Sequence, residues 1–192
     1  MRPSGLAIAL IACFIHPVTL PTPQRSHDFD TTAKISVDQQ ALSFSSAVAI
    51  REARKNLRFE WVRIHFYAFH LTPDDISAAK TGEVTPMDHK SNKNFIDPNV
   101  HSNVWGVIQL SVDDAFKVWQ VDISIPGRAC TIASTESEVD AFLQDYNYDG
   151  ETIRLKTKGS HTCDLSSVGA GLQNYRWDID VSVPVFKKSP SK

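Results

Sequence analysis

The sequence predicts an all-β protein with one or two short helices, built as an antiparallel β-sandwich or an open barrel of about seven strands. Three observations lead to this class. Apolar and polar residues alternate with a period of two, short polar turns separate the alternating segments, and no internal repeat is visible. The 192 residues, 42% of them apolar, are enough for one domain with its own core.

Seven alternating segments are expected as strands, and the last, from Tyr175 to Val185, has the clearest pattern. They cover residues 35–37, 42–50, 57–68, 104–112, 119–125, 153–157 and 175–185. One face is expected to carry the apolar residues Leu42, Phe44, Val48 and Ile50. Near Trp61 and Val62 the phase shifts by one residue, which predicts a β-bulge. The four tryptophans fall within strand patterns and are expected in the core.

Two segments have helical features. Thr72 followed by Pro73 and two acids predicts a short helix that ends near Lys80. Residues 136–144 fit either a short helix capped by Ser134 or Thr135, or a frayed strand. The polar stretch 81–102 is expected to be a long loop with a functional role or high mobility.

The N-terminus resembles a secretory signal, because one positive charge at Arg2 precedes an apolar run too short to span a bilayer. The expected organisation is a signal peptide at 1–20, a linker at 21–32, one domain at 33–186 and a tail at 187–192. The protein is thus expected to be secreted or periplasmic, without a transmembrane segment once the signal is removed. A buried N-terminal element is the alternative. Cys13 ends a lipobox-like sequence, which suggests an envelope lipid anchor.

Cys130 and Cys163 are the two cysteines that remain, and in an exported chain they are expected to form one disulfide. Free buried thiols are the alternative if the chain is not exported. His161 and Cys163 also supply two metal ligands, but no second pair at zinc-finger spacing accompanies them.

Asp145, Asn147 and Asp149 place oxygen ligands at alternate positions before Gly150, as in the first half of a calcium loop. An EF-hand is excluded because Lys156 occupies the position of its bidentate glutamate. A non-EF calcium site is one interpretation, and no other cofactor is expected. The preferred interpretation is a hairpin turn in which Asp149 and Gly150 supply the residues with positive φ.

Arg63, His65 and Tyr67 alternate with apolar residues and should share one strand face, where they form a ligand surface for a sugar or a peptide. The alternative is a mixed face covered by the 81–102 loop. His89 and His101, with Asp88 or Asp97, form a weaker transition-metal hypothesis.

No nucleophile elbow, zinc-protease motif or phosphate loop is present in the sequence, and no catalytic residue is assigned. The net charge of −2 and the pI near 6.4 argue against nucleic acid as a partner. The function expected is a non-catalytic exported module that binds a protein, a glycan or an envelope component. The alternatives are an envelope accessory subunit and a secreted hydrolase. In the hydrolase His65 or His101 would be the base, with an acid drawn from Asp88, Asp97 and Asp145.

Three stretches, residues 33–38 with 47–50, residues 148–155 and residues 175–185, together resemble a family of uncharacterised exported bacterial β-sandwich proteins. The family has Gly-Lys at its first turn, where this chain has Gln39 and Gln40. The resemblance implies a β-sandwich and an exported location, and it implies no activity or site residue.

Overall fold

A computed structural model describes residues 27–53, 59–73, 76–77, 80, 105–125 and 127–187. In this part of the chain the protein is all-β, as expected, and its strands form a single nine-stranded sheet in the order β6-β5-β4-β3-β2-β1-β9-β8-β7. The strands are β1 (Asp30–Val37), β2 (Gln40–Ala53), β3 (Glu60–Tyr67), β4 (Trp105–Val112), β5 (Val118–Ile125), β6 (Arg128–Ala133), β7 (Asp145–Tyr148), β8 (Thr152–Leu165) and β9 (Gly171–Lys187). Short 3-10 helices, η1 (His27–Phe29) and η2 (Ser166–Val168), precede β1 and β9.

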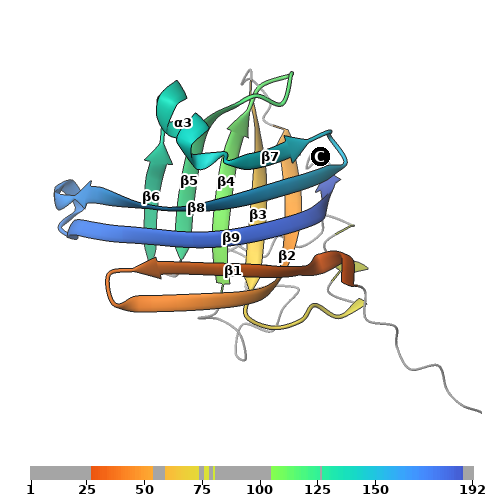
Figure 1. Ribbon diagram of the computed structural model, residues 1–192, viewed down its shortest axis with the longest axis horizontal. Helices are drawn as coiled ribbons and strands as arrows, with labels where there is room; N and C mark the ends of the chain where they lie inside the picture. Colours follow the sequence, from red (N-terminus) through yellow and green to blue (C-terminus); the bar gives the residue numbers. More distant parts are fainter. Residues whose placement is uncertain are drawn as a thin grey trace, which may run out of the picture.

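The sheet curls on itself into a half-barrel, so that β1, β9 and β8 cross in front of β3 to β6 (Figure 1). The long strand β2 belongs to both halves, because its first part pairs with β1 and its second part with β3. Its second part also pairs directly with β9 in parallel, with Ala49 opposite Val185. The main core fills the space between the two halves.

Helix α3 (Glu136–Phe142) closes one end of this core. Of the two alternatives for residues 136–144, a short helix and a frayed strand, the helix is therefore the one that the structure contains. Thr135 accepts a hydrogen bond from the Glu138 backbone, and the Glu138 side chain accepts one in return from the Thr135 backbone. This capping box stabilises the first turn. Val139 and Phe142 are buried, and the Phe142 ring lies 5.3 Å from the Trp177 ring.

The prediction that the apolar residues of β2 share one face is wrong. Phe44 and Ala47 face the main core, whereas Val48 and Ile50 face a second cluster on the outer side of the sheet. The phase changes where the pairing of β2 with β1 shifts register, opposite the stretch between Asp30 and Ala33. The extra residue lies on β1, and the shift coincides with the point where β2 passes from its pairing with β1 to its pairing with β3.

The bulge expected at Trp61 and Val62 is also wrong, since β3 pairs in continuous register with both β2 and β4. Trp61 is simply an outward-facing aromatic residue, and the Arg63 guanidinium lies 4.6 Å from its ring centre. Burial of the tryptophans is confirmed for Trp177, whereas Trp61 and Trp105 are only half-buried and Trp119 is 42% exposed.

The second cluster covers the outer face of β2 and β3. Its buried members are Phe29, Val48, Ile50, Tyr67 and Ile76. The expected helix after Thr72 contributes to it: the described residues between 73 and 80 are helical, and the Ile76 N–H donates to the Thr72 carbonyl.

The sheet has nine strands where about seven were expected, and the two additional strands are β6 and β7 at its edges. Within the described ranges, every helix falls short of the length and apolar character that a bilayer crossing requires. Outside the described residues lie the predicted signal peptide with Cys13, residues 21–26 of the linker, the 81–102 loop with its histidines and acids, and residues 188–192 of the tail. The other linker residues, 27–32, form η1 and the start of β1.

Candidate functional site

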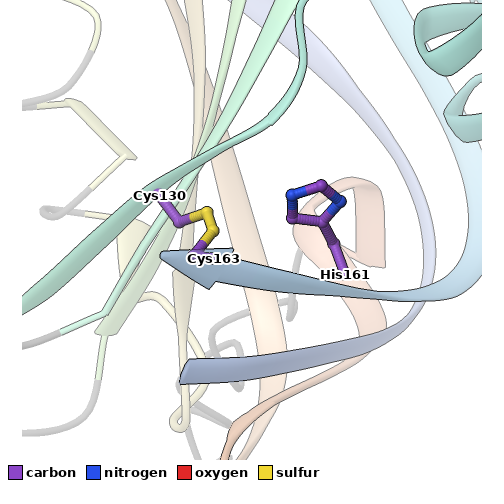
Figure 2. A group of neighbouring side chains, drawn as sticks. All are labelled: Cys130, His161 and Cys163. Atoms are coloured by element: carbon purple, nitrogen blue, oxygen red, sulfur yellow. A yellow bond between two sulfur atoms is a disulfide. The ribbon is translucent and has the colours of Figure 1, made fainter. Parts of the chain in front are cut away.

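Cys130 of β6 and Cys163 of β8 form a disulfide, which confirms the pairing expected from the sequence (Figure 2). The two residues are 33 positions apart, and their Cα atoms are separated by 6.3 Å. The bond joins an edge strand of one half of the sheet to the second strand of the other half. It therefore fixes β6 in place, including the side chains on its outer face.

A pocket of about 540 Å³ lies next to this bond, over the outer face of β3 to β6. Its walls combine charged, amide, hydroxyl and small apolar side chains with the end of β8. The lining residues are Arg63, Val107, Gln109, Asp122, Ser124, Ala129, Cys130, Thr131 and Leu165. The size is typical of a site for a small or medium ligand.

Polar side chains form a continuous hydrogen-bonded row across the four strands of the pocket. Arg63 Nε donates to Gln109 Oε1 at 2.8 Å, and Gln109 Nε2 donates to Asp122 Oδ2 at 3.2 Å. Thr131 Oγ1 donates to Asp122 Oδ1 at 2.6 Å, and Gln120 Nε2 donates to the same carboxylate. Strand register explains the row, since Arg63 is opposite Gln109 and Gln109 is opposite Asp122.

Arg63 is held at one end of the row by two further contacts. Its Nη1 donates to Glu52 Oε2 of β2 at 2.8 Å, and its guanidinium lies over the Trp61 ring. A guanidinium fixed in this way presents its donors in one orientation. The pocket floor is thus preorganised from β2 to β6.

His65 and Tyr67, the other two residues of the predicted ligand face, are only 2% and 4% exposed. Burial, together with the smaller effect of the positive charge of Arg63, lowers the pKa of His65 to about 3. Its Nδ1 has no hydrogen-bond partner within the described structure. Of the three predicted residues, Arg63 is the one that lines the pocket.

The acidic segment at 145–149 forms β7 and the turn that follows it. Asp145 is paired with Arg154, with Oδ2 and Nη2 2.9 Å apart, and Asp149 Oδ1 accepts hydrogen bonds from the Glu151 and Thr152 backbone. These bonds lower the pKa of Asp149. Gly150 has a φ of +92°, as the preferred turn interpretation requires, but Asp149 does not have the positive φ expected for it. Asn147 is exposed on β7, and a calcium site here stays a prediction.

A different set of metal-ligating side chains comes together at the disulfide. The ligand atoms of Cys130, His161 and Cys163 all lie within 4.8 Å of one another. His161 and Cys163 project from the same side of β8, and Cys130 approaches them from β6 (Figure 2). The sequence shows that His161 and Cys163 are close neighbours along the chain, but it does not show that β6 supplies Cys130 as a third ligand.

Gln109, Asp122 and Thr131 were missed in the sequence analysis. Each is a polar residue that alternates with or interrupts apolar residues of its strand, which is the only local signal it carries. Their alignment with Arg63 depends on the register of three strand pairs, and single-sequence patterns do not fix register.

Comparison with family models, curated proteins and solved structures finds no match for this chain. The resemblance to exported β-sandwich proteins therefore stays a prediction, and a function has to be inferred from the residues alone.

Proposed function

We propose that the protein is an exported, non-catalytic binding module that holds a neutral glycan in the pocket over β3 to β6. The observation that carries the proposal is the hydrogen-bonded row from Arg63 through Gln109 and Asp122 to Thr131, which lines a pocket of about 540 Å³. A site of this size with a few fixed polar groups is typical of small-ligand recognition.

The chemistry of the row favours a polyhydroxylated ligand. Guanidinium and amide groups donate hydrogen bonds, carboxylate and amide oxygens accept them, and a hydroxyl does both. A sugar offers both kinds of group on neighbouring carbons. The two charged residues that line the pocket, Arg63 and Asp122, have opposite signs, so they offer little net attraction to an ionic ligand.

A binding role suits these residues better than acid–base catalysis. Both oxygens of Asp122 already accept hydrogen bonds from neutral side chains. His65 is buried, and with a pKa near 3 it is a weak base at neutral pH. Asp122 is therefore suited to binding a ligand, and His65 to stabilising the fold, rather than to transferring a proton.

Calorimetric titration of the full chain with neutral hexose and N-acetylhexosamine oligosaccharides tests the proposal. We expect saturable binding of at least one oligosaccharide, weakened about tenfold or more by Asp122→Asn and by Arg63→Met, because each removes a charge-assisted hydrogen bond. Asp178→Asn is the matched control, since it removes an equally charged side chain from the outer face of β9. Binding that both pocket variants retain, or a preference for polypeptide over every glycan, would contradict the proposal.

Export rests on the apolar run at residues 5–15 and on the disulfide, which persists in oxidising compartments. Mass spectrometry of the protein from its native host tests it. We expect a chain that begins near residue 21, or a lipidated Cys13, with Cys130 and Cys163 oxidised. An intact Met1 together with two free thiols would contradict export.

A further inference from the structure

We propose that Cys130, Cys163 and His161 form a redox-controlled site for a thiophilic d¹⁰ metal ion, Zn²⁺ or Cu⁺, which is available when the disulfide is reduced. The three ligand atoms already lie within 4.8 Å of one another, and they come from two strands of one rigid sheet. Cys130 also lines the glycan pocket, but the metal proposal does not rest on glycan binding, because its readout is metal binding.

The geometry requires little movement. With metal–sulfur bonds of about 2.3 Å and metal–nitrogen bonds of about 2.0 Å, tetrahedral ligand atoms lie roughly 3.3–3.8 Å apart. Breaking the disulfide lets the two sulfurs separate, while the Cα atoms, 6.3 Å apart, keep them close. The His161 side chain is only partly buried, so it can rotate toward them.

The donor set determines the class of metal. Two thiolates and an imidazole favour Zn²⁺ or Cu⁺ over Ca²⁺ and Mg²⁺, which prefer oxygen ligands. Three protein ligands leave one tetrahedral position open to water or to a further ligand. The site thus resembles an exchangeable metal site more than a closed structural one.

A second observation points to a ligand here. Gln173 and Tyr175 of β9 are paired directly with Cys163 and His161 and face the same side of the sheet. Gln173 is 8% exposed and Tyr175 fully buried, yet Gln173 Oε1 and Tyr175 Oη have no hydrogen-bond partner within the described residues. Buried polar atoms without partners are uncommon in folded proteins. Because these two residues are the strand partners of two of the ligands, water on a bound metal would supply a hydrogen-bond donor on this side of the sheet.

The redox chemistry balances with a dithiol as reductant. The dithiol gives two electrons and two protons to the Cys130–Cys163 bond, forms two thiols in the protein and becomes a disulfide itself. A Zn²⁺ or Cu⁺ ion then displaces the two thiol protons, which are released to water, and binds both thiolates and the His161 imidazole. Transfer of two electrons from the thiolates to a disulfide oxidant closes the bond again and releases the ion.

The test uses the full chain in a Cys13→Ser background, because a third thiol would bind metal on its own. The protein is reduced with a water-soluble phosphine, which becomes a phosphine oxide, and is then titrated with Co²⁺ as a spectroscopic probe. We expect one equivalent to bind with a thiolate-to-cobalt charge-transfer band, and Zn²⁺ to displace it. A parallel Cu⁺ titration against a chromogenic chelator distinguishes the two ions. The oxidised protein should bind neither.

Variants identify the ligands. Cys130→Ser and Cys163→Ser should abolish the charge-transfer band, and His161→Ala should weaken binding at least about tenfold. His70→Ala is the matched control, since His70 is an exposed histidine that pairs with Asp30 and does not belong to the ligand group. Circular dichroism records folding throughout. Unchanged affinity in His161→Ala would overturn the proposal, and so would a reduced protein that unfolds and recovers no structure when Zn²⁺ is added.

Discussion

The indole ring of Trp177 lies so close to Gly159 that a β-carbon at Gly159 would stand 2.7 Å from the indole Cζ2. The two residues are paired across β8 and β9, and Trp177 Nε1 donates a buried hydrogen bond to Thr157 Oγ1 at 3.1 Å. The missing side chain at Gly159 therefore makes room for the tryptophan that packs against helix α3.

Gly159→Ala should destabilise the protein by about 1–3 kcal/mol, because the new methyl group forces the Trp177 ring out of its packed position. Urea unfolding monitored by tryptophan fluorescence measures the change. Ser160→Ala, at the next and exposed position of β8, is the control and should be close to neutral. Equal stabilities of the two variants would show that Trp177 accommodates the methyl group at no cost.

Stability should depend on pH through His65. Its folded pKa, about 3, lies below its unfolded value of 6.5, so between these limits the unfolded chain binds a proton that the folded chain does not. Stability is therefore highest above pH 6.5 and falls as the pH is lowered, by up to about 1.4 kcal/mol per pH unit from this group.

Urea unfolding at several pH values between 4 and 7 isolates this contribution when the protein is compared with His65→Leu, whose curve should be flatter. Val48→Ala, opposite His65 in β2, is the control, because it perturbs the same cluster and leaves the imidazole in place. Parallel curves for the protein and His65→Leu would mean that His65 titrates normally in the folded state.

The segment around Asp149 should behave as a turn. Asp149→Ala should lower the melting temperature, because the Glu151 and Thr152 N–H groups lose their shared acceptor. Addition of Ca²⁺ or of a chelator should leave the melting temperature unchanged. A rise in melting temperature with Ca²⁺ that disappears in both Asp145→Ala and Asp149→Ala would instead establish the calcium site.

Removal of the disulfide should cost about 3–4 kcal/mol in the Cys130→Ala/Cys163→Ala double variant, because the unfolded chain loses a cross-link between residues 33 positions apart. Urea unfolding under non-reducing conditions gives the value, with Cys13→Ala as control. A cost below about 1 kcal/mol would show that the two halves of the sheet hold together without the bond.

The fold class could be predicted because strand alternation is a local property. Strand β9 is an example: every second residue is buried and the residues between them are mostly exposed, so its pattern from Tyr175 to Val185 is unambiguous. Strand β8 was predicted only for residues 153–157, although it runs to Leu165. Its second part breaks the pattern because Gly159 accommodates Trp177 and His161 faces the disulfide region.

The edge strands could not be predicted in the same way. Strand β7 has four residues and one buried side chain, so its sequence resembles a turn or a calcium loop. The phase change in β2 was missed because one strand serves two halves of the sheet, and its outward residues are apolar as well. Both errors come from tertiary context that overrides a local pattern.

The candidate site was predictable only in part. Arg63 was selected because it breaks an apolar pattern, but His65 and Tyr67 break it in the same way and are buried. The difference between Arg63 and His65 lies in their partners on the neighbouring strands. Arg63 is paired with the polar Gln109, whereas His65 is paired with Val48 on one side and Val107 on the other. The set of Cys130, His161 and Cys163 likewise depends on the curl that brings β6 to β8.

Nuclear magnetic resonance mapping with the tightest-binding neutral oligosaccharide tests the central claim, that the row from Arg63 to Thr131 is the binding surface. We expect ligand-induced shifts in the backbone amides of β3 to β6 and in the side-chain amide of Gln109, with β1 and the outer face of β9 unaffected. Shifts centred on β1, β8 and β9 would contradict the account, as would no saturable shift with any glycan.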